Sequence, residues 1–164
     1  MTTDLQIRRL IPADHAIWHD IRRASLLKDP DQFDEPLSDF DATSIHDLKA
    51  YLQRNTVFAA LTSGTPIAIA ASYAVPAPRN GRFVRIFGVW VQPDHRGKGL
   101  AERLIQRCIP EHTHAELLVR ANNSPAVNAY ERMGFVETPA PTDAKCYCAT
   151  DDAPGIYMLR PPAP

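Results

Sequence analysis

The feature that most constrains the fold of this chain lies between residues 82 and 109, where a strand, a short loop and a helix follow one another directly. Residues 82–91 are mostly apolar, which predicts a strand with a buried face. Pro93 stops that strand, and from Leu100 onward apolar residues recur every three or four positions, the spacing of a helix with one buried side. Pro110 then ends the helix.

The short loop has the composition of a backbone that binds anions. Gly97 and Gly99 allow main-chain N–H groups to approach anionic oxygens closely. The start of the following helix offers unpaired N–H donors and a partial positive charge. Arg96 and Lys98 add full positive charges. The loop therefore predicts a site for a pyrophosphate group, held by the main-chain N–H groups from Gly97 to Ala101.

Two widespread phosphate-binding motifs do not fit this loop. A Walker loop needs Gly-x-x-x-x-Gly-Lys followed by Ser or Thr, and the chain contains no such string. The dinucleotide motif Gly-x-Gly-x-x-Gly fails because Glu102 stands at the third glycine position. A dinucleotide-dependent oxidoreductase is further opposed by the late position of the loop in the chain.

Two other motifs are present, in order and separated by an apolar run that predicts a strand over residues 115–121. The first is Arg-x-x-Gly-x-Ala, formed by Arg96, Gly99 and Ala101. The second, over residues 123–135, is Asn-x-x-Ala-x-x-x-Tyr-Glu-x-x-Gly-Phe. Together they resemble the acetyl-CoA loop and the second signature of the GNAT superfamily of N-acetyltransferases. Residues 123–135 match the second signature at every fixed position.

The predicted elements follow the order strand, helix, helix, three strands, helix, strand, helix and two strands. Strands are predicted at residues 5–11, 57–61, 66–75, 82–91, 115–121, 135–137 and 155–160, with a further portion around 145–148. Helices are predicted at residues 12–28, 45–54, 100–109 and 124–133. This order predicts a mixed α/β fold. The resemblance implies a GNAT-like fold, with a central mixed sheet of about six to seven strands, helices on both faces and a splay between the fourth and fifth strands.

More detailed predictions concern the first helix, the segment that follows it and the last helix. The last helix is expected to begin with Ser124 as its N-cap and to stop at Gly134. Residues 29–43 are predicted to be a loop because Pro30 and Pro36 interrupt the helical pattern. The apolar face of the first helix is expected to hold Ile17, Trp18, Ile21, Ala24 and Leu27.

The length and composition are those of an ordinary globular domain. At 164 residues the chain is long enough for a sizeable core, so we expect a single N-acetyltransferase domain over residues 1–164 with a disordered tail at residues 161–164. The formal net charge of −1 gives no general attraction to nucleic acid or to anionic membranes. Neither a signal peptide nor an apolar run of about 20 residues is found. We expect a cytoplasmic protein without nucleic-acid or membrane partners, and a homodimer stays open.

The resemblance implies which residues handle acetyl-CoA as the co-substrate. It implies that the strand ending at Val91 splays from its neighbour, which frees main-chain groups at Val89 and Val91 for the pantetheine amides and the acetyl carbonyl. It also implies that Asn123 contacts the cofactor arm and that Tyr130 protonates the CoA sulfur. The expected cofactor-binding residues are Val89, Val91, Arg96, Gly97, Lys98, Gly99, Leu100, Ala101, Asn123 and Tyr130.

Tyr130 has suitable chemistry for this catalytic role. A phenol with a pKa of about 10 can donate a proton to a developing thiolate with a pKa of about 8.5 when the two lie within hydrogen-bond distance. Both signature residues also have ordinary structural interpretations. Tyr130 can be a core residue, and Asn123 can be a loop residue that caps the following helix.

The acceptor and the general base are less well defined. By resemblance, the loop between the first two helices borders the acceptor, and residues 29–43 contain six carboxylates. We therefore expect a cationic primary amine, on a small molecule or a peptide, with Asp34 and Glu35 as contacts; the alternative is a solvated loop. The strand over residues 82–91 lacks the acidic residue that many relatives carry there. Glu116, Glu35, Asp34 and an ordered chain of waters stay open as the route for the amine proton.

Cysteines and histidines predict neither a disulfide framework nor a metal site. The three cysteines are an odd number, and Cys108 falls on the apolar face of its helix. Cys146 and Cys148 share one face of a predicted strand portion. His112 and His114 lie close in sequence, but no further ligand completes a set at metal spacing. We therefore expect no metal cofactor.

The motifs favour an enzyme over a binding module. We expect an N-acetyltransferase that moves an acetyl group from acetyl-CoA to a primary amine by direct attack, with Tyr130 as the general acid on the CoA thiolate. A non-catalytic acyl-CoA-binding or sensor domain of the same fold is the alternative. The intact loop with Tyr130 supports the enzyme, whereas the missing strand carboxylate supports the binding domain.

Overall fold

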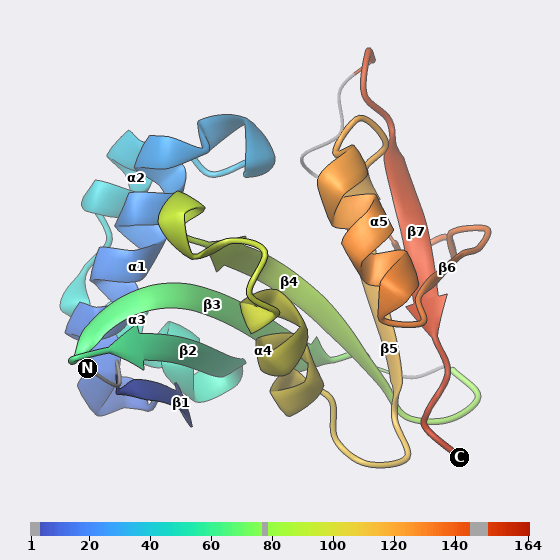
Figure 1. Ribbon diagram of the computed structural model, residues 1–164, viewed down its shortest axis with the longest axis horizontal. Helices are drawn as coiled ribbons and strands as arrows, with labels where there is room; N and C mark the ends of the chain where they lie inside the picture. Colours follow the sequence, from blue (N-terminus) through green and yellow to red (C-terminus); the bar gives the residue numbers. More distant parts are fainter. Residues whose placement is uncertain (1–3, 77–78, 145–150) are drawn as a thin grey trace. The chain divides into compact units, whose positions relative to one another are not determined.

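The computed structural model describes residues 4–76, 79–144 and 151–164 (Figure 1). Its strands are β1 (Leu5–Arg9), β2 (Thr56–Thr62), β3 (Thr65–Ala74), β4 (Phe83–Val91), β5 (His114–Arg120), β6 (Val136–Glu137) and β7 (Gly155–Arg160). Its α-helices are α1 (His15–Lys28), α2 (Leu37–Asp41), α3 (Ile45–Arg54), α4 (Leu100–Cys108) and α5 (Ser124–Arg132). Single 3-10 turns are η1 (Pro12–Asp14), η2 (Pro30–Gln32) and η3 (Pro93–His95). The strand portion predicted around residues 145–148 lies outside the described residues.

The strands form one seven-stranded mixed sheet in the order β1-β2-β3-β4-β5-β7-β6. The pairs β1–β2, β2–β3, β5–β7 and β6–β7 are antiparallel, and β4–β5 is parallel. The parallel register begins at Phe83 with His114 and ends at Arg85 with Glu116. In contrast, β5 pairs with β7 from Ala115 to Arg120. The mixed sheet and the splay after its fourth strand confirm the predicted fold class.

The chain divides into two compact units. The first unit comprises Met1–Tyr73 and Gly88–Cys108, and the second comprises Ala74–Phe87 and Ile109–Pro164. Strand β4 contributes to both, because residues 83–87 belong to the second unit and residues 88–91 to the first. Among the helices of the described segments, none has the length and apolar character that a membrane crossing requires.

In the first unit, β2 and β3, which correspond to the strands predicted at residues 57–61 and 66–75, form a hairpin. Its turn consists of Ser63 and Gly64, with φ of 50° and 80°, the left-handed conformations that favoured two-residue hairpin turns require. Helix α4 has the buried face that the spacing of its apolar residues predicts. Its buried residues are Leu100, Leu104, Ile105 and Cys108.

Helix α1 departs from its predicted apolar face at one position. Its buried residues are Trp18, Ile21, Ser25 and Leu26. Leu27, which we expected to face the core, is 59% exposed. It lies about two and a half turns after Trp18 at 3.6 residues per turn, so its side chain is on the opposite side of the helix.

The segment between α1 and α3 is more regular than the predicted loop. It contains η2 and α2, and Phe40 of α2 is buried. The two prolines begin these elements instead of interrupting them, since Pro30 lies in the first turn of η2 and Pro36 is the N-cap of α2. A proline is tolerated at the start of a helix because its missing N–H would have no partner there.

In the second unit, α5 is capped by a different residue from the one predicted. The N-cap is Asn123, whose side-chain Oδ1 accepts a hydrogen bond from the backbone N–H of Ala126 at 3.4 Å. Ser124 is the first residue of the helix instead. Both residue types are good caps, so the sequence pattern alone does not separate them. Gly134, with φ of 89°, follows the helix as predicted.

Candidate functional site

The loop between β4 and α4, drawn in yellow in Figure 1, has a backbone geometry that suits an anion. Gly97 and Gly99 have φ of 74° and 71°, values that favour glycine. A Cβ placed on either residue would meet no atom within 4 Å, so the space beside both is open. Helix α4 begins directly afterwards at Leu100, and its first N–H groups have no partners within the helix. The loop and the helix start therefore offer main-chain donors to an anion.

Arg96 and Lys98, the predicted charged contacts, are bonded to neighbouring groups. Arg96 Nε donates to the carbonyl oxygen of Val91 at 3.0 Å, and Arg96 Nη2 donates to Asp29 Oδ2 at 2.6 Å. Lys98 Nζ donates to the carbonyl oxygen of Asp94 at 3.1 Å. The Arg96 side chain is 50% exposed, so its guanidinium still faces solvent beside the glycine loop.

Asp29 is a member of this site that short sequence motifs do not reveal. Its Oδ2 also accepts a hydrogen bond from Trp90 Nε1 at 2.7 Å. Burial alone would raise the pKa of Asp29, but the hydrogen bonds from Trp90 and Arg96 lower it overall. Asp29 is therefore a carboxylate at neutral pH. It lies 67 residues from Arg96 in the sequence, and its only sequence signal is membership of the acidic segment.

The main-chain positions predicted to bind the cofactor arm lie at the end of β4. Val89 and Val91 are partly exposed, whereas Trp90 between them is buried. Both valines lie beyond Arg85, the last residue of β4 in the parallel register. The carbonyl of Val91 accepts the bond from Arg96, which ties the end of the strand to the glycine loop.

Tyr130, the predicted general acid, lies in α5 of the second unit. Its ring packs edge-on against Phe135, with ring centroids 6.0 Å apart. The residue is partly buried, and this burial raises the pKa of its hydroxyl to about 12. Tyr130 is therefore a neutral phenol at physiological pH. Asn123, expected to contact the cofactor arm, lies in the same unit and caps α5.

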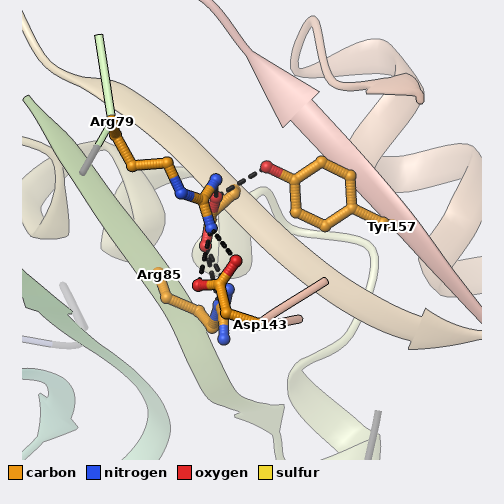
Figure 2. A network of polar contacts seen from close by, with 5 residues as sticks. Arg79, Arg85, Asp143 and Tyr157 are labelled. Atoms are coloured by element: carbon orange, nitrogen blue, oxygen red, sulfur yellow. Dashed lines mark hydrogen bonds and ion pairs between the residues drawn. The ribbon is translucent and has the colours of Figure 1, made fainter. Parts of the chain in front are cut away.

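A network of polar contacts surrounds Glu116 of β5 in the second unit (Figure 2). Glu116 is fully buried. Its Oε2 accepts hydrogen bonds from Arg79 Nη1 at 2.9 Å and from the Tyr157 hydroxyl at 2.6 Å. Its Oε1 accepts from Arg85, by Nε at 2.8 Å and by Nη2. Arg79 Nη2 also donates to both oxygens of Asp143 at 2.9 Å, so the network contains two positive and two negative groups.

This network argues against Glu116 as the base for the amine proton, because both of its oxygens already accept hydrogen bonds. Burial and the hydrogen bond to Glu116 raise the pKa of Tyr157 to about 12. Tyr157 therefore keeps its proton at neutral pH and does not act as the base either. The partners Arg79, Tyr157 and Asp143 were not predicted. Arg79 is 37 residues from Glu116 and 64 from Asp143, distances at which no local pattern signals a contact.

Asp34 and Glu35, expected to contact the acceptor, have different surroundings. Asp34 is exposed, whereas Glu35 forms an ion pair with Arg22 at 3.0 Å. The other ion pairs within residues 29–43 are Asp29 with Arg96 and Asp41 with Arg23. Half of the six carboxylates are thus neutralised by arginines, so the segment is less negative than its composition suggests.

His114 packs against an aromatic ring, and Cys108 lies in the core. The ring of His114 stacks on Phe83, with centroids 4.4 Å apart. Cys108 is buried, and burial raises the pKa of its thiol to about 12. Over residues 4–76, 79–144 and 151–164, no three His, Cys, Asp or Glu side chains form a group that could hold a metal ion. Cys146 and Cys148 lie outside these residues.

The family model described as acetyltransferase (GNAT) family matches residues 17–135. This match covers more than half of the chain and includes the glycine loop, Asn123 and Tyr130. The chain therefore belongs to the GNAT family of acetyltransferases, a family of acyltransferases. A search of curated proteins finds no match.

Three solved structures share the fold over nearly the whole chain. The GNAT-family acetyltransferase of Streptococcus pneumoniae is 18% identical with a TM-score of 0.74, covering 98% of this chain and 100% of its own. The yncA protein of Salmonella typhimurium, solved with its cofactor acetyl-CoA, is 18% identical with a TM-score of 0.70, covering 97% and 94%. The PaiA N-acetyltransferase of Thermoplasma acidophilum, solved with coenzyme A, is 14% identical with a TM-score of 0.66, covering 96% and 99%. At these identities the similarity concerns the fold.

Proposed function

We propose that this protein transfers the acetyl group of acetyl-CoA to a primary amine. The observation that carries the proposal is the glycine loop, in which Gly97 and Gly99 leave open space directly before the first turn of α4. A pyrophosphate is the group that such a loop suits. Two similar structures, yncA and PaiA, were solved with acetyl-CoA and with coenzyme A, which supports the same ligand here.

In this proposal the backbone does most of the cofactor binding. The N–H groups of residues 97–101 donate to the pyrophosphate oxygens, and Arg96 adds a charge-assisted hydrogen bond. Main-chain groups at Val89 and Val91 pair with the pantetheine amides, and an N–H there polarises the acetyl carbonyl and stabilises the developing oxyanion. Asn123 contacts the cofactor arm.

The proposed reaction is direct attack by a neutral amine on the thioester carbon. A bond from nitrogen to carbon forms, the bond from carbon to sulfur breaks, the nitrogen loses a proton and the sulfur gains one. Tyr130 donates a hydrogen bond to the leaving sulfur. Because the pKa of Tyr130 is about 12, the phenol keeps its proton at neutral pH and is available as the proposed general acid. It donates that proton to the sulfur as the carbon–sulfur bond breaks, and the proton released by the amine restores the phenol.

A non-catalytic acyl-CoA-binding or sensor domain is the second candidate. It is favoured by the absence of an acidic residue from β4 and by the complete engagement of Glu116. Thiol release from acetyl-CoA, measured over a panel of polyamines, amino acids, lysine peptides, peptide N-termini and amine antibiotics, separates the two. Turnover with any acceptor supports the transferase. Binding by calorimetry without turnover across the panel supports the second candidate, and failure to bind contradicts both.

We further infer a cationic acceptor, recognised in part by the segment over residues 29–43. Three of its carboxylates, Asp31, Asp34 and Asp39, are exposed, and they would concentrate positive substrates. The other three are paired with arginines, so we expect a modest preference. We keep three expectations as predictions: a single domain over residues 1–164, a cytoplasmic location and a homodimer.

A further inference from the structure

Asp29 connects the start of the segment over residues 30–43 to the glycine loop. It is the C-cap residue of α1, directly before η2. Its Oδ2 accepts hydrogen bonds from both Trp90 Nε1, at 2.7 Å, and Arg96 Nη2, at 2.6 Å. Arg96 Nε in turn donates to the carbonyl oxygen of Val91 at 3.0 Å. One carboxylate thus joins the end of α1, the end of β4 and the loop proposed to bind pyrophosphate.

The position of this carboxylate is set by a buried partner. Trp90 is 4% exposed, so its indole N–H is fixed in the core and holds Asp29 in one place. The Asp29 side chain is itself 25% exposed. A charge that is anchored in this way loses little conformational freedom when it binds a second donor, unlike an ion pair between two mobile surface side chains. Asp29 can therefore set the direction of the Arg96 guanidinium.

Arg96 can keep both of its bonds and still bind an anion. A guanidinium carries five N–H donors in a rigid planar fork, and only Nε and one Nη2 hydrogen are needed for the bonds to Val91 and Asp29. The Arg96 side chain is 50% exposed, so an anion can approach it from solvent. Fixing the fork in advance favours anion binding, because less side-chain entropy is lost when the anion arrives.

The segment over residues 30–43 has two further arginine–carboxylate pairs, and neither involves the glycine loop. Glu35 pairs with Arg22 at 3.0 Å, and the guanidinium of Arg22 lies 4.4 Å from the centre of the Phe33 ring. At the other end, Asp41 pairs with Arg23 at 2.9 Å. Both arginines belong to α1. Among these three carboxylate attachments, only the one at Asp29 is shared with the glycine loop.

We propose that Asp29 is a positioning residue that couples cofactor binding at the glycine loop to the order of residues 30–43. This coupling rests on the proposed function, since it requires that the glycine loop binds the pyrophosphate of CoA. When Arg96 is held by that anion, its bond to Asp29 is held too, and the start of the segment becomes more ordered. By thermodynamic reciprocity, an ordered segment must also favour CoA. Because the segment is proposed to border the acceptor, this coupling predicts that CoA and the amine each increase the affinity of the protein for the other.

The test combines calorimetry and amide hydrogen exchange on the full chain, with coenzyme A as the probe. For the wild type we expect CoA to slow exchange in residues 30–43. For Asp29→Ala we expect CoA binding to weaken about five- to thirtyfold and the CoA-induced protection of residues 30–43 to disappear. Asp29→Asn, which keeps an acceptor oxygen for Trp90 or Arg96, should recover part of both effects.

Asp41→Ala is the matched control, because it removes an Arg–Asp pair from the same segment without touching the glycine loop. It should bind CoA like the wild type and keep the CoA-induced protection. Should Asp29→Ala fail to fold, Asp29→Glu gives the same test, because it keeps the charge but displaces the carboxylate by one methylene, and the protection should again fall.

The outcomes separate this inference from the proposed function. If the wild type does not bind CoA, the proposed function is wrong and the coupling falls with it. If the wild type binds CoA but folded Asp29→Ala binds equally well or more tightly, with the same protection of residues 30–43, the coupling is wrong and the proposed function stands.

Discussion

The glycine loop of the first unit and the Glu116 network of the second unit use the same residue types in opposite ways. At the loop, Arg96 is 50% exposed and its carboxylate partner Asp29 is 25% exposed. In the network, the side chains of Arg79 and Arg85 are only 15% and 12% exposed, and Glu116 is fully buried. A buried charge with every oxygen satisfied holds elements together, whereas an arginine with spare donors in solvent can recognise an anion. Burial, more than composition, therefore separates a structural charge cluster from a binding site.

The largest effect on stability should come from the buried network. Glu116→Gln removes the negative charge and leaves Arg79 and Arg85 facing each other with little solvent. Breaking a buried ion pair on one side typically costs about 3–5 kcal/mol, and urea denaturation measures this loss. Asp143→Asn is the control, because it changes the solvent-exposed member of the network and should unfold close to the wild-type midpoint. A wild-type midpoint for Glu116→Gln would show that the network is not structural.

A comparably large effect, on catalysis instead of stability, is expected at Tyr130. Tyr130→Phe should lower kcat by about 10²–10⁴-fold, as expected for loss of a group that donates to the leaving atom, with little change in the Kd for acetyl-CoA. Since the pKa of Tyr130 is about 12, the phenol stays protonated from pH 6 to pH 10. The fall in kcat should therefore be the same across that range. A wild-type kcat, measured where chemistry limits the rate, would leave Tyr130 as a packing residue.

Arg96 and Arg79 should respond in opposite ways to alanine substitution. Arg96→Ala should weaken acetyl-CoA binding by about 1–3 kcal/mol, the contribution of a hydrogen bond to a charged group, with little loss of stability because its ion pair is half exposed. Arg79→Ala should lower stability, because Glu116 loses a partner in the core. Calorimetry and urea denaturation of both variants check this pattern. Loss of stability in Arg96→Ala without loss of binding would reverse the assignment of the two arginines.

The smallest effect is expected from the acidic segment. Neutralising Asp34, Glu35 and Asp39 together should lower kcat/KM for cationic amines by about two- to tenfold relative to neutral amines, and high salt should remove the difference. Glu35→Gln alone should do least, since Glu35 is already paired with Arg22. Equal kcat/KM values for matched cationic and neutral amines in the unmodified protein would show that this segment does not select the acceptor.

The sequence predicts those parts of the fold that depend on neighbouring residues. The β2–β3 hairpin, the apolar face of α4 and the strand, loop and helix from β4 to α4 all follow from local spacing and turn chemistry. The predictions for Leu27 and for the cap of α5 failed where two adjacent residues satisfy the same local rule. We also predicted that Pro30 and Pro36 interrupt helical structure, whereas each of them stands at the start of a short helix.

The sequence does not predict the charged contacts, because the residues that form them lie far apart along the chain. Glu116 meets Arg79, Arg85 and Tyr157 from 31 to 41 residues away in the sequence. Asp29 meets Arg96 from 67 residues away. Such contacts depend on how strands pair and where chain segments return, which no short pattern encodes.

The most direct test of the central claim, that the glycine loop binds acetyl-CoA, is calorimetry on Gly99→Val beside Gly64→Val. Both glycines have a left-handed φ, of 71° and 80°, with no atom within 4 Å of an added Cβ, so both variants carry a similar backbone strain of about 1–2 kcal/mol. Gly64 lies in the β2–β3 turn, and its variant should bind acetyl-CoA like the wild type. Gly99→Val, whose side chain fills the space proposed for the pyrophosphate, should bind at least about tenfold more weakly, a loss of about 1.4 kcal/mol or more. Equal affinities in the two folded variants would contradict the account.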